Sequence, residues 1–197
     1  MPQASERLEG RLVVLEPLVQ ADRIGLAKVA ADPEIWRWMH LDGSTSEGFR
    51  SWFDAALAAA QAGTEIPFVT RLGRTGEAVG STRFLSLAPE HRRVEIGHTW
   101  LARSAWGTGA NVEAKLLMLR HAFGELGCLR VEFKTDAQNE RSRTALAALP
   151  ARFEGVHRKH MLVRDGKRRD SAWYSVLDDE WSEVRVNLLR RLGREGE

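Results

Sequence analysis

A glycine-rich turn between a strand-like run and a helix-like run limits what this chain can fold into more than any other feature. The strand-like run spans residues 94–101, and the helix-like run spans residues 112–123. At such a turn, several backbone N–H groups have no partner within the helix, and the helix dipole adds positive potential. Glycine lets a ligand approach this backbone closely. The pattern predicts a phosphate seat, or else a plain connection, over Trp106, Gly107, Thr108, Gly109, Ala110 and Asn111.

Composition narrows the class of protein. The 197 residues are 43% hydrophobic and 28% charged, which is typical of one soluble domain with a substantial core. A net charge of +2 gives little reason to expect a nucleic-acid partner. Cys128 is the only cysteine, so an internal disulfide and a multi-cysteine zinc site are excluded. Its apolar neighbours predict a buried thiol.

The sequence shows no sign of a membrane or secretory segment. No apolar run approaches the roughly 20 residues that a spanning helix needs. The first residues, which include Glu6, Arg7 and Glu9, lack the apolar core of a signal peptide. We therefore expect a cytoplasmic protein with no membrane partner.

Apolar periodicity and turn residues divide the chain into strands and helices. Ser44 and Glu47 form a plausible capping box for a helix over residues 48–62, and Asp165-Gly166 indicates a hairpin. The class is α+β, one domain over residues 1–197 with a mixed, mainly antiparallel sheet flanked by helices. Its one parallel crossover joins 93–101 to 129–135. We expect strands over 11–17, 66–72, 78–87, 93–101, 129–135, 153–163 and 169–177, and helices over 22–31, 33–39, 48–62, 112–123, 139–149 and 178–192.

The order of these elements and their motifs resembles the GNAT acetyltransferases, specifically the RimJ/RimL-like branch. The resemblance covers residues 8–181, nearly the whole chain. The family has a Gln/Arg-x-x-Gly-x-Gly/Ala loop where this chain has residues 106–111, followed by Glu113-Ala114. Its Asn-x-x-Ser motif appears as residues 139–142. The run 153–155 and the closing hairpin also match.

The resemblance implies acetyl-coenzyme A (acetyl-CoA) as co-substrate and no metal. Its pyrophosphate would lie on the loop N–H groups, and its pantetheine arm would add to an exposed strand edge. For that edge to be free, the strands 93–101 and 129–135 must part and split the sheet. The implied cofactor contacts are Thr99, Trp100, Leu101, Trp106, Gly107, Thr108, Gly109, Ala110, Asn111, Asn139 and Ser142.

Two loop residues depart from the family pattern. Trp106 replaces the usual Gln or basic residue, which removes a polar partner near the phosphates, and Arg103 is a candidate substitute. Asn111 replaces a small Gly or Ala where backbone would meet phosphate. Either the loop has another shape or the Asn111 amide contacts the ligand.

Acetyl transfer to an amine needs a base for the amine and a donor that polarises the thioester carbonyl. Glu95 is the leading candidate base, acting through a water; the alternative is a surface carboxylate paired with Arg93 or Arg130. The N–H of Leu101 is a candidate donor to the carbonyl. His98 would face away from the cleft on an ideal strand unless a bulge turns it.

The departing thiolate should also gain a proton. Ser142 is the implied donor, although a Ser at this position can equally cap or pack its helix. Tyr174, the only tyrosine, is a further candidate acid or substrate-cleft residue. We expect Trp36, Trp38 and Trp52 in the core, and the basic residues within 158–169 solvated at a hairpin tip.

The expected function is acetyl-CoA-dependent N-acetylation of a primary amine by direct attack in a ternary complex. The acceptor would be a peptide or protein N-terminus or a small amine. The alternative is a non-catalytic acyl-CoA sensor or partner-binding domain on the same fold. The aromatic content permits a homodimer without requiring one.

Overall fold

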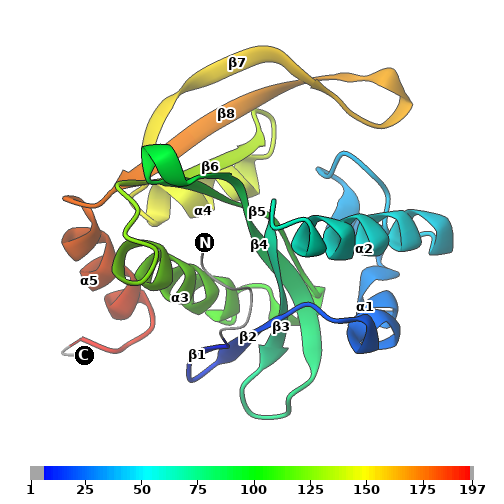
Figure 1. Ribbon diagram of the computed structural model, residues 1–197, viewed down its shortest axis with the longest axis horizontal. Coiled ribbons are helices and arrows are strands. Elements are labelled where there is room, and N and C mark those ends of the chain that lie inside the picture. Colours follow the sequence, from blue (N-terminus) through cyan, green and yellow to red (C-terminus); the bar gives the residue numbers. More distant parts are fainter. Residues whose placement is uncertain (1–6, 196–197) are drawn as a thin grey trace.

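An eight-stranded mixed sheet carries helices on both faces in the computed structural model, which describes residues 7–195 (Figure 1). The strand order is β1-β2-β3-β4-β5-β6-β8-β7. Every neighbouring pair is antiparallel except β5 and β6, which confirms the expected α+β class and its one parallel crossover. The strands are β1 (Leu8–Glu9), β2 (Val13–Pro17), β3 (Ile66–Leu72), β4 (Ala78–Ala88), β5 (Arg93–Leu101), β6 (Arg130–Asp136), β7 (Arg152–Leu162) and β8 (Arg168–Leu177).

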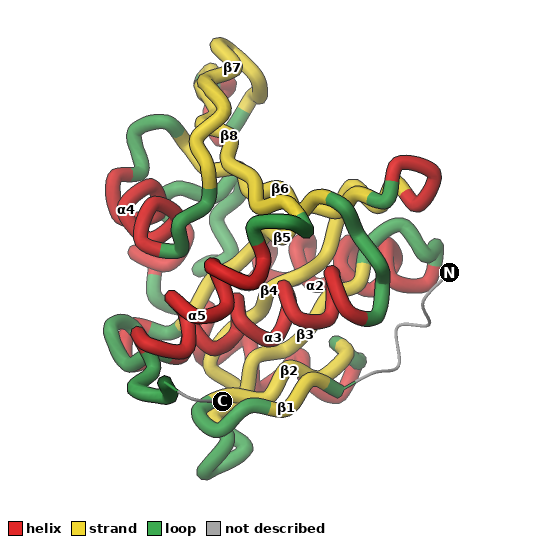
Figure 2. Tube along the Cα trace, turned by 90° about the vertical axis from the view of Figure 1, so that its left-hand side faces the viewer, coloured by secondary structure: helices red, strands yellow, loops and turns green. Residues whose placement is uncertain are grey.

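The helices form two layers. Helices α1 and α2 cover one face of the sheet through β4 and β3, whereas α3, α4 and α5 cover the other (Figure 1). In the tube view of Figure 2, α3 and α5 lie in front of the sheet and α2 lies behind it. Helix α3 lies between the sheet and α5, so it is buried on most sides and shows little amphipathic pattern. The helices are α1 (Arg23–Ala30), α2 (Ser46–Gln61), α3 (Ala110–Gly124), α4 (Glu140–Ala148) and α5 (Trp181–Arg191).

The parallel pair β5–β6 is short, and the sheet splits where it ends. Residues Arg93, Val94 and Glu95 pair with Arg130, Val131 and Glu132. Beyond Glu95, β5 continues to Leu101 paired only with β4, and β6 continues to Asp136 paired only with β8. The expected parting of these two strands is confirmed.

A bulge interrupts β5 next to the split. Between the pairs Ser81–Trp100 and Arg83–Gly97, β5 contributes His98 and Thr99 against a single residue of β4. His98 has a φ of 47°, in the left-handed region. This two-against-one arrangement bends the strand and redirects its side chains.

Several expected element ends are shifted. Thr45, not Ser44, caps α2, because its side chain accepts the N–H of Gly48 at 3.0 Å. The helix expected over 33–39 is a single 3₁₀ turn, η2 (Pro33–Trp36). The hairpin at Asp165 is present, but its tip is the 3₁₀ turn Arg164–Gly166. Strand β1 was not expected from the sequence.

The core has two parts, one on each face of the sheet. Trp36 and Trp52 are fully buried on the α1–α2 side and pack with Trp100, as expected for core aromatic residues. Cys128 is buried, and burial raises the pKa of its thiol. None of the helices in the described residues is long and apolar enough to cross a membrane.

A buried carboxylate fixes the start of α3. Glu113 has no exposed surface, and its oxygens accept the backbone N–H groups of Arg11, Leu12 and Val13 at 3.0, 2.5 and 2.8 Å. Arg194 adds an ion pair at 2.5 Å. Residues from both ends of the described chain therefore converge on the helix turn that follows the glycine loop.

Replacing Glu113 by Gln tests this anchor. The change places an NH₂ donor against backbone N–H donors, so buried groups lose their acceptor, and we expect a loss of about 3 kcal/mol in the free energy of unfolding. Denaturant titration gives the value. The exposed Glu183→Gln, in the first turn of α5, serves as the control. Equal stability of the two variants would contradict this role for Glu113.

Candidate active site

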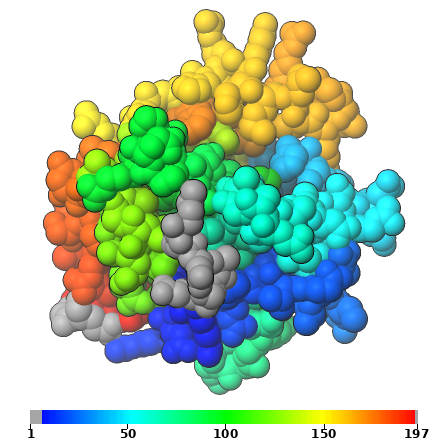
Figure 3. Space-filling model, viewed as in Figure 1, coloured from blue at the N-terminus to red at the C-terminus, as the bar shows by residue number. Residues whose placement is uncertain are grey.

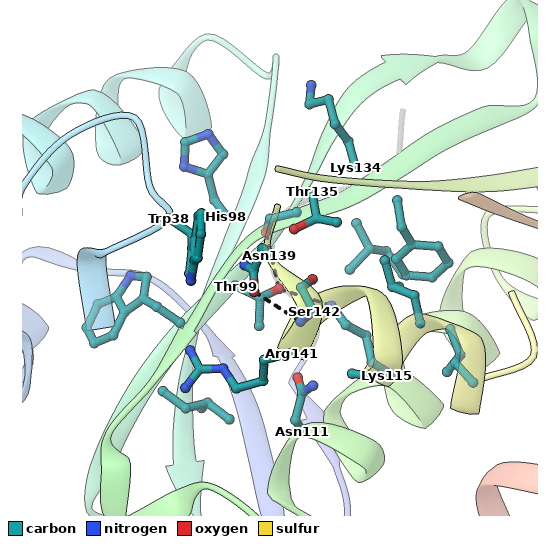
Figure 4. A pocket seen from close by; sticks show the side chains of 18 of the residues that line it. Trp38, His98, Thr99, Asn111, Lys115, Lys134, Thr135, Asn139, Arg141 and Ser142 are labelled. Atoms are coloured by element: carbon teal, nitrogen blue, oxygen red, sulfur yellow. Dashed lines mark hydrogen bonds between the residues drawn. The ribbon is translucent and has the colours of Figure 1, made fainter. Parts of the chain in front are cut away.

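A cavity of about 570 Å³ opens where β5 and β6 part (Figure 4). Its floor is α3 and the free part of β5, and one wall is α4. Lys134 and Thr135 on β6 contribute to another wall, and the segment that follows η2 closes the side opposite α4 with Trp38. Of the residues expected at the site, Glu95, Thr99, Trp100, Leu101, Trp106, Gly107, Gly109, Asn111, Asn139 and Ser142 line this cavity.

The loop before α3 presents free backbone donors. Gly107 and Gly109 have φ values of 74° and 88°, which turn the chain sharply into the helix. From Gly107 to Val112, only the Ala110 amide has a partner among residues 7–195, the hydroxyl of Thr108 at 3.4 Å. The unpartnered N–H groups are those of Gly107, Thr108, Gly109, Asn111 and Val112. Together with the dipole of a 15-residue helix, they form a site suited to an anion.

Trp106 has a structural role and an unexpected cationic partner. Its indole N–H donates to the carbonyl of Leu101 at 2.9 Å, which ties the loop to the end of β5. The Arg141 guanidinium lies 3.8 Å from the centre of the Trp106 ring, whereas that of Arg103 lies 5.9 Å away and faces Asp32. Arg141, on α4, therefore supplies a positive charge at the loop, a role for which Arg103 was only one candidate.

Two amide side chains, those of Asn111 on α3 and Asn139 before α4, line the cavity. The oxygen of Asn111 is buried without a hydrogen-bond partner among the described residues. Asn139 caps α4, because its Oδ1 accepts the N–H of Ser142 at 3.1 Å. Since Asn139 does the capping, the Ser142 hydroxyl, which makes no hydrogen bond within residues 7–195, is left facing the cavity (Figure 4).

Glu95 lies at the point where the strands part. Its side chain is buried, and its Oε2 accepts hydrogen bonds from the Lys134 Nζ and the Ser86 hydroxyl, both at 3.3 Å. Burial raises the pKa of Glu95, and Lys134 opposes this shift. The alternative partners Arg93 and Arg130 bind Glu132 instead, so the surface-pair interpretation of Glu95 is wrong.

The bulge turns His98 into the cavity, which corrects the expectation for an ideal strand. Burial lowers the pKa of His98 to about 3, with further contributions from Arg83 and other cations. Its Nδ1 is buried without a hydrogen-bond partner in the described chain, and its ring contacts that of His40. His98 is thus a neutral imidazole at physiological pH.

Lys115 is a site residue that sequence reasoning missed. It projects from α3 into the gap, and its Nζ donates to the Thr99 hydroxyl at 3.0 Å (Figure 4). Burial lowers the pKa of this amine to about 7. The signal in the sequence was a single lysine inside the apolar run 114–119 of the central helix.

Some expected site residues lie elsewhere. Tyr174 is buried and does not line the cavity; its hydroxyl accepts a hydrogen bond from Arg143 at 3.1 Å, and its ring packs on Phe153. Thr108 and Ala110 are also outside the lining. Conversely, Trp38 was expected in the core but is only half-buried and faces the cavity.

The comparisons with known proteins agree with this geometry. A family model described as "Acetyltransferase (GNAT) domain" matches residues 12–151, which is most of the chain. The chain belongs to the GNAT acetyltransferase family. A crystal structure titled as a putative acetyltransferase from T. thermophilus is 40% identical, with a TM-score of 0.85 over 95% of this chain and 97% of that one.

Two further relatives of this GNAT protein are informative. RimJ from Mycobacterium smegmatis, in complex with CoA-disulfide, is 26% identical and has a TM-score of 0.77, covering 92% of this chain and 90% of that one. The uncharacterized N-acetyltransferase YoaA of Bacillus subtilis is 26% identical over 86% of this chain and 96% of its own length. The likeness to RimJ supports the RimJ/RimL-like branch.

GNAT acetyltransferases use acetyl-CoA, and the cavity has the features that this molecule requires. The free amides of the loop match a diphosphate, and a Cβ at Gly107 would meet no atom within 4 Å, so the backbone there is open to a ligand. The unpaired edge of β5 can accept the amide-bearing arm. No group of three or more potential metal ligands occurs among the described residues.

The anion seat can be tested at Gly107, because Asn and Asp both tolerate its positive φ and differ mainly in charge. We expect Gly107→Asp to weaken acetyl-CoA binding at least about tenfold more than Gly107→Asn, through repulsion of the diphosphate. Calorimetry measures both affinities. Gly109 is a poorer position, because its Cβ would meet Leu12 at 3.0 Å. Equal affinities of the Asp and Asn variants would argue against phosphate at this loop.

Proposed function

We propose that this protein is an acetyl-CoA-dependent N-acetyltransferase that acetylates a primary amine by direct attack in a ternary complex. The observation that carries the proposal is that one cavity contains both the free amides before α3 and the buried carboxylate of Glu95. An anion seat and a base thus meet at a strand edge that is open to a ligand. Both a small amine and a peptide N-terminus are compatible with this arrangement.

Groups that can deprotonate the amine and polarise the thioester carbonyl both lie at the gap between β5 and β6. When bound, acetyl-CoA supplies an acetyl group activated as a thioester. Glu95 accepts, through a water, the proton that the attacking amine loses, and its raised pKa makes it a stronger base than an exposed glutamate. Backbone N–H groups along the free part of β5 polarise the carbonyl. The products are the acetylated amine and the free thiol of CoA.

Two side chains are placed to stabilise or protonate the sulfur of CoA as it leaves. The Ser142 hydroxyl is free to donate a proton to the leaving thiolate, as the Asn-x-x-Ser pattern suggested. Lys115 holds its amine in the gap beside Thr99, and its positive form favours a thiolate nearby. Tyr174 is not part of this proposal, because it lies outside the cavity lining.

A thiol-release assay with acetyl-CoA and a panel of amines tests the function. A non-catalytic sensor would bind acetyl-CoA without releasing thiol with any acceptor, and changes at Glu95 and Ser142 would then have no effect. Release that depends on both acceptor and Glu95 supports the enzyme.

Glu95 sets the expected pH dependence. Only the ionised carboxylate is a base, so activity is lost as the pH falls through the pKa of Glu95, and this acid limb should lie above the ordinary value of about 4.3. Glu95→Gln should lower kcat about 100-fold or more and abolish the limb, while acetyl-CoA still binds. The exposed Glu90→Gln is the control. An unchanged pH profile in Glu95→Gln would remove Glu95 as the base.

Ser142→Ala should lower kcat by about 10- to 100-fold and leave the affinity for acetyl-CoA within about twofold. Steady-state kinetics and calorimetry separate the two effects. Thr144→Ala removes an exposed hydroxyl from the same helix and controls for effects on α4. Parallel losses of turnover and affinity would instead mean that Ser142 helps to hold the cofactor.

A further inference from the structure

The wall of the cavity near Glu95 carries an excess of positive charge. Lys134 on β6 and Arg169 on β8 both line it, and Glu95 carries the only carboxylate among the described lining residues. Lys134 already binds Glu95 at 3.3 Å. Arg169 interacts electrostatically first with Asp136 and then, more weakly, with Glu95. The ion-pair partner of Arg169, Asp136, does not line the cavity, so within the lining the two cations face one carboxylate.

Arg169 is the unusual member of this pair. It was expected to be solvated at the hairpin, but its side chain is only 9% exposed. Its Nε is buried and has no hydrogen-bond partner among the described residues, and the nearest carboxylate oxygen, on Asp136, lies 3.9 Å away. A buried guanidinium nitrogen without a hydrogen bond is costly, so this geometry points to a ligand that completes it.

The two imidazoles in the same region do not offset the charge of Lys134 and Arg169. The pKa values of His98 and His40 are lowered, first by burial and then by nearby cations that include Arg169 and Lys134. Both rings are therefore neutral at physiological pH and add no charge. The field in this part of the cavity favours an anion and opposes a cation.

A contact between the β7–β8 hairpin and the segment after η2 spans one side of the cavity. Arg164, at the tip of the β7–β8 hairpin, donates to Asp42 at 2.8 Å and to the carbonyl of Trp36 at 3.2 Å. This contact joins the hairpin, which projects as a ridge at the top of the space-filling view, to the segment after η2 (Figure 3). Trp38 and Met39 of that segment line the cavity, as does Met161 of β7. A partly apolar space that this contact narrows suits a small acceptor better than a folded protein.

We propose that the acceptor is a small amine that carries a carboxylate, with the carboxylate bound by Arg169 and the amino group turned to Glu95. This inference rests on the proposed function and narrows its substrate class. Arg169 makes charge-assisted hydrogen bonds to the carboxylate, and Lys134 adds attraction at longer range. The reaction is unchanged: a C–N bond forms, the C–S bond breaks, the amine proton passes to Glu95 and the sulfur gains a proton.

Matched acceptors test the substrate class in the thiol-release assay. The probes are L-methionine and L-phenylalanine against their amides, and ω-amino acids against alkylamines of equal length. The acid of the preferred pair should have a kcat/KM about 10- to 100-fold higher than its neutral partner. The amide has the lower amine pKa, so a preference for the acid cannot come from a larger neutral fraction. Polyamines and aminoglycosides should be poor acceptors.

Substitutions of Arg169 then test whether this residue binds the carboxylate of the acceptor. Arg169→Gln should raise KM for the carboxylate acceptor about 10- to 100-fold, with little change for its neutral partner. Arg169→Lys keeps the charge and should recover part of the loss. Arg168→Gln removes the same charge from the exposed neighbouring position and should match the wild type. Acetyl-CoA affinity, measured by calorimetry, should be the same in all four proteins.

The outcomes separate this inference from the proposed function. Neutral amines acetylated as well as their acids in every pair, or Arg169→Gln with an unchanged preference, would overturn the carboxylate inference and leave the enzyme standing. Acidic peptides turned over better than free amino acids would place the carboxylate on a peptide and overturn the small acceptor. Acetyl-CoA binding without thiol release for any acceptor would overturn the proposed function itself.

Discussion

The structure depends on one constraint: two parallel strands pair over three residues and then separate. An unpaired strand edge within a protein leaves backbone N–H and C=O groups without hydrogen-bond partners, which costs free energy. The separation therefore persists only because other contacts hold each strand. Strand β5 is held by β4 and β6 by β8, each along its length. The gap is thus a stable feature of the sheet, and everything in the site is placed relative to it.

The buried charges of the central helix and of β5 differ in how well their hydrogen bonds are satisfied. Glu113 accepts hydrogen bonds from three backbone N–H groups and forms an ion pair with Arg194, so it anchors α3 and with it the glycine loop. Lys115, two residues later on the same helix, has only the Thr99 hydroxyl as a hydrogen-bond partner among the described residues. Glu95 has cationic and hydroxyl partners at the limit of good hydrogen bonds. The well-satisfied charge stabilises the fold, whereas the incompletely satisfied ones lie at the cavity, as is common at functional sites.

Much of the fold could be predicted because its signals are local. Strands β3 and β5 have the expected bounds, since alternation and turn residues mark both ends. The glycine loop was also readable, because it depends on residues adjacent in sequence. The partners of Glu95 and Trp106 were not. Lys134 and Arg141 reach them from β6 and α4, and no periodicity in β5 or the loop indicates which distant side chain arrives.

By itself, the sequence determined the order of the longer strands and helices, the glycine turn before the central helix, and the positions of Glu95 and Ser142 on their strand and helix. Those features follow from backbone preferences and hydrophobic periodicity, which act over a few residues. Only the tertiary structure decided that His98 faces the cavity, that Tyr174 does not, and that Arg169 is buried in the cavity wall. The reason is physical: a bulge, a strand crossing or a hairpin bridge sets side-chain direction and burial through contacts between segments far apart in the chain.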